Sequence, residues 1–427
     1  MNPKRIVIVG GGAAGFFAAI ACAEKSPGAE IVVLEKTSQF LSKVKISGGG
    51  RCNVTHACFD GRDFARRFPR GERALIAPFT QFQAADTVKW FAERGVRLKT
   101  ESDGRMFPTT DSSRTIMDCL LAAAERAEVK LKTNCGVERV AKRADGRFEV
   151  TMANHNDGTA ALLVGQDTRQ RVPPTLACDK LLLATGGCRT PALGRLAVSL
   201  GHTLEPPVPS LFTFHIATRW LRELAGVSVE WVEVSVPESK LRERGPLLVT
   251  HSGLSGPSIL RLSAWGARKL HDMNYEFPLR VNWLPHLNAE KLAAELAARR
   301  ESQPARLLVN APISPLPTRL WEKLVLAAGI AKDTRCSALS KGAQHKLAQH
   351  LHHTEFQVNG KSLNKDEFVT CGGVRLSEVN FKTMESRICP GLFFAGELLD
   401  VDGITGGFNF QAAWTTGWIA GRAMAQG

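Results

Sequence analysis

The chain has 427 residues, of which 44% are hydrophobic and 22% are charged, and this size predicts a large enzyme of two or three domains. Its ten cysteines form no C-x-x-C pair and no Cys/His cluster, which gives no support to metal binding or dithiol exchange and predicts buried, reduced thiols. The net charge of +14 suits anionic cofactors or substrates and weak adhesion to nucleic acid, but the basic residues are dispersed, which favours a solvated surface.

The start of the chain carries a dinucleotide-binding pattern. Residues 4–9 predict a buried strand, and Gly10, Gly12 and Gly15 follow with G-x-G-x-x-G spacing at the start of an alanine-rich helix. The first glycine permits a tight turn, the second lets a pyrophosphate approach the backbone, and the third allows close packing of helix on strand. Glu35, at the end of the next predicted strand, can accept hydrogen bonds from ribose hydroxyls, while the helix start faces the phosphates. This segment is predicted to bind the ADP half of a dinucleotide.

The same segment superficially imitates a signal peptide or a short membrane span. Residues 6–23 are uncharged and follow Lys4 and Arg5. The glycines in the middle of the apolar run, and the strand that follows it, argue against export. We therefore expect a cytoplasmic protein with no membrane partner.

The middle of the chain predicts further sheet elements and then an inserted domain. A loop is expected over 39–56, and a polar, variable loop over 154–172. Helices are predicted at about 60–70, 81–95, 112–127, 288–302 and 317–330, and strands at 129–133, 136–143, 146–152, 179–187, 228–236 and 245–251. Between about 190 and 365 there is no second G-x-G-x-x-G, so a separate nicotinamide-binding Rossmann domain is not expected. That stretch is interpreted as a β-rich domain with a helical subdomain.

The C-terminal stretch has the same arrangement of elements as the start of the chain. A strand at 392–397 leads into a glycine-rich turn and an alanine-rich helix that begins near Asn409. Backbone N–H groups at such a helix start can hold an anionic or electron-rich group, here the carbonyl edge of a flavin or the pyrophosphate. Together with the ADP-binding segment, this turn predicts FAD as the cofactor.

Blocks distributed almost end to end resemble the BaiN-like or aminoacetone-oxidase-like family of bacterial FAD-dependent oxidoreductases. The blocks lie at 10–15, 45–56, 105–113, 181–187, 247–260 and 383–417. The resemblance implies an α/β fold in which a Rossmann-like FAD-binding domain, a parallel sheet with a β-meander, is interrupted by a β-barrel-like domain with a helical insertion. The expected limits are 1–190 and 366–427 for the FAD-binding domain, 191–365 for the inserted domain and about 286–350 for its helical part.

The resemblance also implies cofactor contacts. The first glycine turn would hold the pyrophosphate, Glu35 and Lys36 the adenosine ribose, and Glu397 the ribitol, while Arg51 would supply positive charge near phosphate or flavin. Residues 47–53 would lie against the cofactor or, alternatively, form only a tight structural loop. Asp402 would orient the C-terminal loop, and for Asp400 a loop cap is as plausible as a functional role. The complete expected set is Gly10, Gly12, Ala13, Ala14, Gly15, Glu35, Lys36, Ser47, Gly48, Gly49, Gly50, Arg51, Cys52, Asn53, Thr185, Gly186, Gly187, Gly396, Glu397, Asp402, Gly406, Gly407, Phe408 and Asn409.

The expected activity is hydride transfer between a small organic substrate and the flavin, which needs no nucleophilic triad. His251 is the candidate proton donor or acceptor, although a single histidine without a visible partner also fits a structural role. Reduction of an enone or other C=C bond with NAD(P)H as a transient co-substrate is the first hypothesis, and oxidation of a small amine by oxygen is the alternative. A third hypothesis, an FAD-containing protein that binds or modifies RNA, lacks a basic, aromatic sequence motif. No metal site and no specific nucleic acid are expected, and no oligomeric state is predicted.

Overall fold

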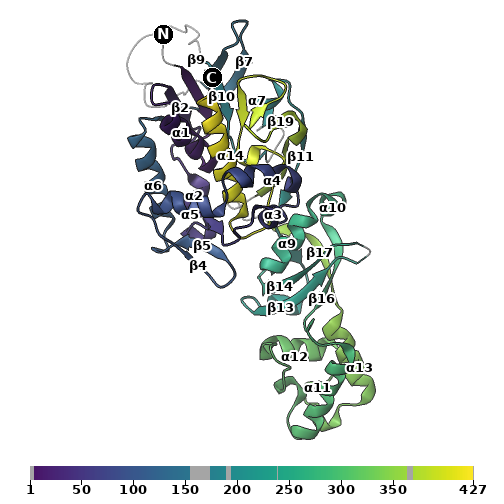
Figure 1. Ribbon diagram of the computed structural model, residues 1–427. Coiled ribbons are helices and arrows are strands. Elements are labelled where there is room, and N and C mark those ends of the chain that lie inside the picture. Colours follow the sequence, from purple (N-terminus) through teal and green to yellow (C-terminus); the bar gives the residue numbers. More distant parts are fainter. Residues whose placement is uncertain (1–3, 154–173, 189–193, 238, 363–368, 427) are drawn as a thin grey trace, which may run out of the picture. The chain divides into compact units, whose positions relative to one another are not determined.

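The computed structural model describes residues 4–153, 174–188, 194–237, 239–362 and 369–426 (Figure 1). The chain divides into two compact units. One comprises Met1–Pro209 together with Val369–Gly427, and the other comprises Ser210–Phe368. Both ends of the chain therefore build the first unit, and the second unit is inserted between them.

The first unit contains a seven-stranded sheet in the order β19-β20-β21-β10-β1-β2-β6. Strand β1 (Arg5–Val9), apolar and β-branched from Ile6 onward, pairs in parallel with β2 (Glu30–Leu34) on one side and with the central strand β10 (Lys180–Leu183) on the other. The other strands are β6 (Lys130–Lys132), β21 (Leu392–Phe394), β20 (Glu385–Ser386) and β19 (Val379–Asn380), and β20 pairs antiparallel with both β21 and β19. Because the strand order reverses beside β1, the carboxyl ends of β1 and β10 form a topological switch point, where open α/β sheets bind ligands.

The first and last helices of this unit are in close contact, as Figure 1 shows for α1 (Ala13–Lys25) and α14 (Phe408–Met424). A Cβ atom on Gly417 would lie 2.4 Å from the carbonyl oxygen of Ala14, and one on Gly421 would lie 2.3 Å from that of Ala18. Only glycine permits this approach, so α14 is tied directly to the helix that follows β1. The other helices are α2 (Ser42–Gly50), α3 (Gly61–Ala65), α4 (Glu72–Gln81), α5 (Ala84–Ala92), α6 (Ser113–Arg126) and α7 (Arg195–Val198).

Small antiparallel sheets complete the first unit. A three-stranded meander is formed by β7 (Val137–Lys142), β8 (Phe148–Met152) and β9 (Thr175–Cys178). A second sheet has the order β3 (Thr55–His56), β5 (Arg105–Pro108) and β4 (Leu98–Thr100), and β11 (Leu204–Ser210) pairs with β18 (Val369–Val374). The predicted α/β class, with a parallel sheet and a β-meander, is confirmed.

Two local predictions are wrong. The expected loop over 39–56 contains α2, whose backbone leaves the helical region at Ser47, Gly48 and Gly49. Helix α4 was not predicted, because Pro78 interrupts its apolar pattern. The predicted polar loop over 154–172 lies outside the described residues.

The second unit is a closed barrel with attached helices. Its strands follow the order β12 (Thr213–Ile216), β15 (Gly253–Ser255), β14 (Arg242–Val249), β13 (Ser228–Ser235), β16 (Glu276–Asn282) and β17 (Thr354–Ser362). Its helices are α8 (Arg219–Arg222), α9 (Pro257–Trp265), α10 (Ala267–Asp272), α11 (Ala289–Ser302), α12 (Thr318–Ala327) and α13 (Lys341–His352). One apolar core, which includes Trp283 and Trp321, runs through the barrel and the helical part. The predicted barrel with a helical insertion is confirmed. No helix within the described ranges has both the length and the apolar character of a membrane span.

Candidate cofactor site

The glycines that follow β1 have three different structural roles. Gly10 has a φ of 113°, and a Cβ atom on it would lie 2.2 Å from the carbonyl oxygen of Ala184 at the end of β10. A Cβ atom on Gly15 would lie 2.0 Å from the carbonyl oxygen of Gly10. Around Gly12, by contrast, no atom lies within 4 Å of the Cβ position. Gly10 and Gly15 allow the backbone to pack closely, and Gly12 leaves open space.

That open space lies at the start of α1. Gly12 is the N-cap residue, no side chain caps the helix, and the first turn carries no acidic residue. The helical bonding begins with Phe16 N–H and the carbonyl oxygen of Gly12, at 3.0 Å, so the N–H groups of Ala13, Ala14 and Gly15 have no intrahelical acceptor. With the positive end of the helix dipole, this start fits a phosphate group.

The carboxylate of Glu35 is directed toward the same turn. Its Oε2 accepts a hydrogen bond from Gly11 N–H at 2.9 Å, and its Oε1 accepts from the backbone N–H and the hydroxyl of Thr37 at 2.9 and 2.8 Å. Lys36 is exposed, and its aliphatic chain passes Gly136 instead. The structure therefore joins Glu35 to the first turn but directs Lys36 toward a different backbone segment.

The ends of β10 and β21 adjoin this turn as well. A Cβ atom on Gly396 would lie 2.9 Å from that of Ala14, and one on Gly187 would lie 2.5 Å from Glu397 Oε1.

Glu397 accepts a hydrogen bond from Thr370 N–H at 3.0 Å and forms an ion pair with Lys43 Nζ at 2.5 Å. Lys43, on α2, is not among the residues predicted from the sequence, although it lies just before the block at 45–56. Gly186 has open space around it, and Thr185 is exposed beside it.

The second glycine turn precedes α14 and is held by residues 53–56. Gly407 has a φ of 92°, and a Cβ atom on it would lie 2.5 Å from the carbonyl oxygen of Thr55. With the Asn53 amide oriented so that both of its groups find partners, its oxygen accepts a hydrogen bond from Gly407 N–H at 3.0 Å and its nitrogen donates to the carbonyl oxygen of Thr55 at 3.0 Å. His56 Nδ1 lies 3.2 Å from the carbonyl oxygen of Gly406. The predicted residues Asn53, Gly406 and Gly407 therefore contact one another.

Side chains of the second turn itself also bind protein groups. Asn409 accepts a hydrogen bond from Gly403 N–H at 2.8 Å and donates to the carbonyl oxygen of Gly403 at 2.9 Å. Phe408 is 2% exposed and packs against Phe64 and other aromatic rings. Asp402 is fully buried and pairs with Arg70 through both carboxylate oxygens. The side chains of Phe408 and Asn409 thus stabilise the loop, and the groups that remain to face a ligand are the backbone N–H groups at the start of α14.

A buried polar network lies beneath this turn and was not singled out from the sequence. Gln411 Oε1 accepts hydrogen bonds from the hydroxyls of Thr55 at 2.7 Å and Thr87 at 2.9 Å, and Gln411 Nε2 donates to Thr415 at 3.1 Å. Trp414 Nε1 donates to the carbonyl oxygen of Val54 at 2.9 Å. The sequence does carry a signal for this network, because the polar residues Gln411 and Thr415 interrupt an otherwise apolar helix. The network fixes α14 to β3.

The remaining predicted residues have different surroundings. Arg51 lies over the Phe107 ring at 4.0 Å and forms an ion pair with Glu101 at 2.6 Å, which raises the pKa of Arg51 above its usual value. Cys52 is fully buried, and burial raises its pKa to about 12, so its thiol is unreactive. Ser47 donates a hydrogen bond to the carbonyl oxygen of Val44 at 3.1 Å. Four predicted residues remain. Gly48, Gly49 and Gly50 are exposed in the first unit, and His251 is exposed in the second unit.

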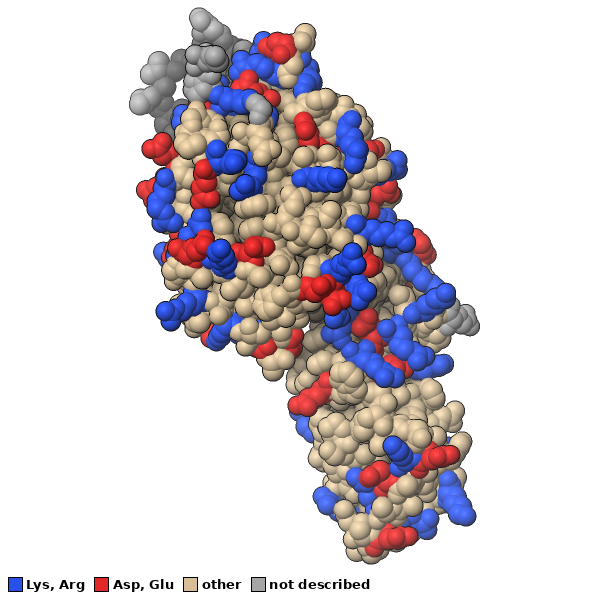
Figure 2. All heavy atoms as spheres, viewed as in Figure 1, with Lys and Arg blue, Asp and Glu red and all other residues tan. Residues whose placement is uncertain are grey.

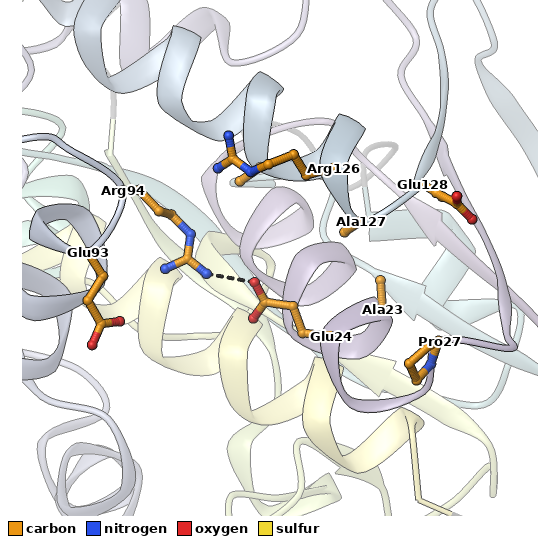
Figure 3. A pocket seen from close by; sticks show the side chains of 9 residues that line it. Ala23, Glu24, Pro27, Glu93, Arg94, Arg126, Ala127 and Glu128 are labelled. Atoms are coloured by element: carbon orange, nitrogen blue, oxygen red, sulfur yellow. Dashed lines mark hydrogen bonds and ion pairs between the residues drawn. The ribbon is translucent and has the colours of Figure 1, made fainter.

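These surroundings fit a dinucleotide. Gly12, Gly49, Gly50 and Gly186 leave open positions that a Cβ would occupy, and two helix starts offer N–H donors. A separate cavity of about 920 Å³ lies at the other end of α1, where Arg94 pairs with Glu24 at 2.6 Å (Figure 3). None of the predicted site residues lines that cavity. The glycine turns are the candidate cofactor site.

Comparisons with known proteins agree with this geometry. Residues 4–423 match the HI0933-like protein Rossmann domain. The chain is 30% identical to a 3-dehydro-bile acid delta(4,6)-reductase of Clostridium scindens over 99% of both chains, and 31% identical to a ribosomal RNA dihydrouridine synthase of Escherichia coli over 98% of this chain and 97% of the relative. A solved 3-ketosteroid-delta4-(5alpha)-dehydrogenase of Rhodococcus jostii RHA1 shares the fold, with a TM-score of 0.52 at 15% identity over 100% of both chains. The chain therefore belongs to the HI0933-like Rossmann family of FAD-dependent oxidoreductases, as its sequence blocks predicted.

Proposed function

We propose that the chain binds one FAD at the two glycine turns and reduces a carbon–carbon double bond conjugated to a carbonyl group, with NAD(P)H as electron donor. The observation that carries the FAD site is that two helix-starting glycine turns, from opposite ends of the sequence, belong to one unit and are joined by the α1–α14 contact. A single site of this kind suits a cofactor that carries an adenosine at one end, a flavin at the other and a diphosphate between them.

Each part of the site has a proposed partner on the cofactor. The N–H groups at the start of α1 would bind the pyrophosphate, and Glu35 would bind the adenosine ribose. Glu397, held by Thr370 and Lys43, would bind the ribityl chain. The start of α14 would donate N–H groups to the flavin edge. The bound flavin supplies two-electron hydride chemistry, so the protein contributes position and electrostatics.

The relative from Clostridium scindens supports the reaction class, because its name describes a reductase and the alignment runs end to end. In such a reduction one alkene carbon gains a hydride and the other a proton, while NAD(P)H is oxidised to NAD(P)⁺. The nicotinamide would bind transiently, since the chain has no second G-x-G-x-x-G between 190 and 365. The nicotinamide must therefore reach the flavin, transfer its hydride and leave as NAD(P)⁺ before the acceptor is reduced.

A uracil base of ribosomal RNA is a second candidate acceptor. The Escherichia coli relative is named a ribosomal RNA dihydrouridine synthase, and the 5,6 double bond of uracil is also conjugated to a carbonyl. The second unit offers a basic surface, which we define as Lys240, Arg242, Arg244, Arg261 and Lys269 with Trp265. Figure 2 shows Lys and Arg side chains gathered on this unit.

The basic surface combines charge with an exposed aromatic ring. Arg242 and Arg244 are 65% and 55% exposed, and the indole of Trp265 is 41% exposed. Arg261 connects α9 to β14 by binding Glu243 at 3.0 Å and the carbonyl oxygen of Arg244. Guanidinium groups attract phosphates and an exposed indole can stack on a base, so this surface favours the RNA candidate.

Anaerobic stopped-flow spectroscopy tests the donor and the acceptor separately. The purified, yellow protein is mixed with NADH, NADPH or a small primary amine, and the reduced protein is then mixed with a 3-oxo-4-ene steroid or a uridine-containing RNA. We expect NAD(P)H to bleach the flavin and a conjugated alkene to restore its absorbance. Bleaching by the amine alone, with reoxidation only by oxygen, would replace this proposal with the amine-oxidase alternative.

The RNA candidate has its own comparison. Arg242→Glu with Arg244→Glu should abolish salt-dependent RNA binding and dihydrouridine formation but preserve steroid reoxidation. Lys341→Glu with Lys346→Glu, on the exposed face of α13, is the matched charge control and should change neither reaction. Equal loss in both double variants would show that overall charge, rather than the basic surface, accounts for RNA binding.

A further inference from the structure

The peptide group between Gly406 and Gly407 is held at both of its polar ends by one short segment. The carbonyl oxygen of Gly406 lies 3.2 Å from His56 Nδ1, and the N–H of Gly407 lies 3.0 Å from the amide oxygen of Asn53. A carbonyl oxygen can only accept a hydrogen bond, so His56 carries its proton on Nδ1 in this contact. Asn53 and His56 therefore bind opposite ends of the same peptide group.

This peptide group needs such restraint because glycine flanks it on both sides. Gly406 has a φ of 130° and Gly407 a φ of 92°, values that glycine adopts at no steric cost. Glycine also gives the peptide freedom to rotate, which would turn its carbonyl and N–H groups away from their present directions. The helix N-cap is Gly407 itself, so a rotation would also move the first N–H groups of α14.

The imidazole of His56 is enclosed on several sides. Its ring centroid lies 4.8 Å from that of Phe408, and a Cβ atom on Gly104 would lie 2.6 Å from His56 Nε2. Burial is the largest cause of a lowered pKa for His56; Arg67 and Arg105 also lower it, while the Gly406 carbonyl and Asp103 raise it. His56 is consequently neutral at pH 7 in the structure described here, and a negative charge that develops nearby would favour its protonation.

We propose that Asn53 and His56 are positioning residues that hold the Gly406–Gly407 peptide so that the start of α14 faces the flavin, and that His56 takes up a proton from solvent when the flavin is reduced. The inference rests on the proposed FAD site. The two electrons come from NAD(P)H, and the proton on His56 returns to solvent when the acceptor is reduced. Asn53 fixes the geometry, whereas His56 adds a dependence on pH.

Two substitutions separate these roles of His56. His56→Asn keeps an N–H donor at about the place of Nδ1 but removes the titrating group, and His56→Phe keeps a ring against Phe408 but removes both. The measurements are FAD affinity, from quenching of FAD fluorescence, and the midpoint potential of the bound flavin between pH 5 and 9. Neither measurement requires turnover.

We expect the wild-type potential to fall more steeply with pH than that of His56→Asn, by about 30 mV per pH unit, over the interval between the two pKa values of His56. His56→Asn should bind FAD within about twofold of the wild type, whereas His56→Phe and Asn53→Leu should bind it about tenfold more weakly. His271→Asn, which replaces an exposed histidine of the second unit, is the control and should match the wild type in both measurements.

Two different results would overturn the proposal. If His56→Asn kept the wild-type slope of potential against pH, the proton uptake by His56 would be wrong. If His56→Phe and Asn53→Leu bound FAD as tightly as the wild type, the positioning role would be wrong. A wild-type protein that binds no FAD would instead refute the proposed function, so the two failures are distinguishable.

Discussion

The two glycine turns of the first unit reach their conformations by different means. In the turn after β1, Gly15 packs against the carbonyl group of Gly10, and Gly10 packs against the backbone of Ala184, about 170 residues away at the end of the neighbouring strand β10. In the turn before α14, Gly406 and Gly407 are held by Asn53, Thr55 and His56, which are about 350 residues away in the sequence. Gly10 and Gly15 of the first turn pack against backbone atoms, whereas Gly406 and Gly407 of the second turn are also held by the side chains of His56 and Asn53.

This difference predicts different consequences of substitution. At the first turn Gly12 has open space around it, so a side chain there would displace a ligand and leave the fold intact. At the second turn most side chains already bind protein groups, so substitutions would first change the stability of the unit. Experiments that measure ligand binding and stability in parallel can therefore test whether the two turns really differ.

The largest expected effect is at Gly12. Gly12→Val should weaken FAD binding at least a hundredfold, because the isopropyl group would occupy the space where the pyrophosphate approaches the start of α1. Its unfolding midpoint in urea, measured without FAD, should stay close to that of the wild type. FAD affinity is measured by fluorescence titration of the apoprotein.

Gly28→Val is the matched control, because Gly28 also has no atom within 4 Å of its Cβ position and has no positive φ. It lies in the turn between α1 and β2, outside the proposed site, and should retain FAD. Equal loss of FAD in both variants would mean that Gly12 has no special place in binding.

Much of the first turn could be predicted from the sequence. The spacing of Gly10, Gly12 and Gly15, the strand before them and Glu35 after them are local signals with a known physical basis. The barrel was also predictable in outline, since its strands alternate between buried and exposed positions, as β16 does. Periodicity of this kind records which face is buried.

The second turn was predicted only as a glycine-rich cofactor loop. Nothing near Gly407 in the sequence indicates that Asn53 accepts a hydrogen bond from Gly407 N–H, or that Gln411 accepts hydrogen bonds from the hydroxyls of Thr55 and Thr87. These contacts depend on how β3 and α14 pack, which single-sequence patterns do not encode. Lys43 and His56 were overlooked for the same reason.

The next largest effect is expected at the ion pair that closes the second turn. Asp402→Asn should destabilise the protein by about 3 kcal/mol, because Arg70, 14% exposed, would lose the carboxylate of a fully buried partner. The measurement is urea unfolding followed by fluorescence. Asp63→Asn breaks the exposed Arg66–Asp63 pair and should cost less than about 0.5 kcal/mol. A similar cost for both would show that the buried pair does not stabilise the turn.

A smaller effect is expected where α14 meets α1. Gly421→Ala should destabilise the protein by about 2 kcal/mol, because the new methyl group would clash with the carbonyl oxygen of Ala18 and separate the two helices. Gly342→Ala, in the first turn of α13 with open space around it, should instead stabilise the protein by about 0.5 kcal/mol. Thermal unfolding of both variants compares the signs. If Gly421→Ala left the unfolding temperature unchanged, the close helix contact would not link the two turns.

The smallest expected effect is the dependence of stability on pH at His56. Its folded-state pKa is lowered from the ordinary value of 6.5, chiefly by burial, so below pH 6.5 the unfolded chain binds more protons at this position than the folded chain does. The stability that neutral His56 supports is therefore complete above pH 6.5 and is lost as the pH falls toward the folded-state pKa. Urea unfolding at pH 7.5 and pH 5 should show a larger loss of stability for the wild type than for His56→Asn. The other histidines are common to both proteins, so the difference isolates His56. An equal loss in both would mean that the imidazole is not confined at the second turn, and the contrast between a turn packed against backbone atoms and one held by distant side chains would then rest on Asn53 and Thr55 alone.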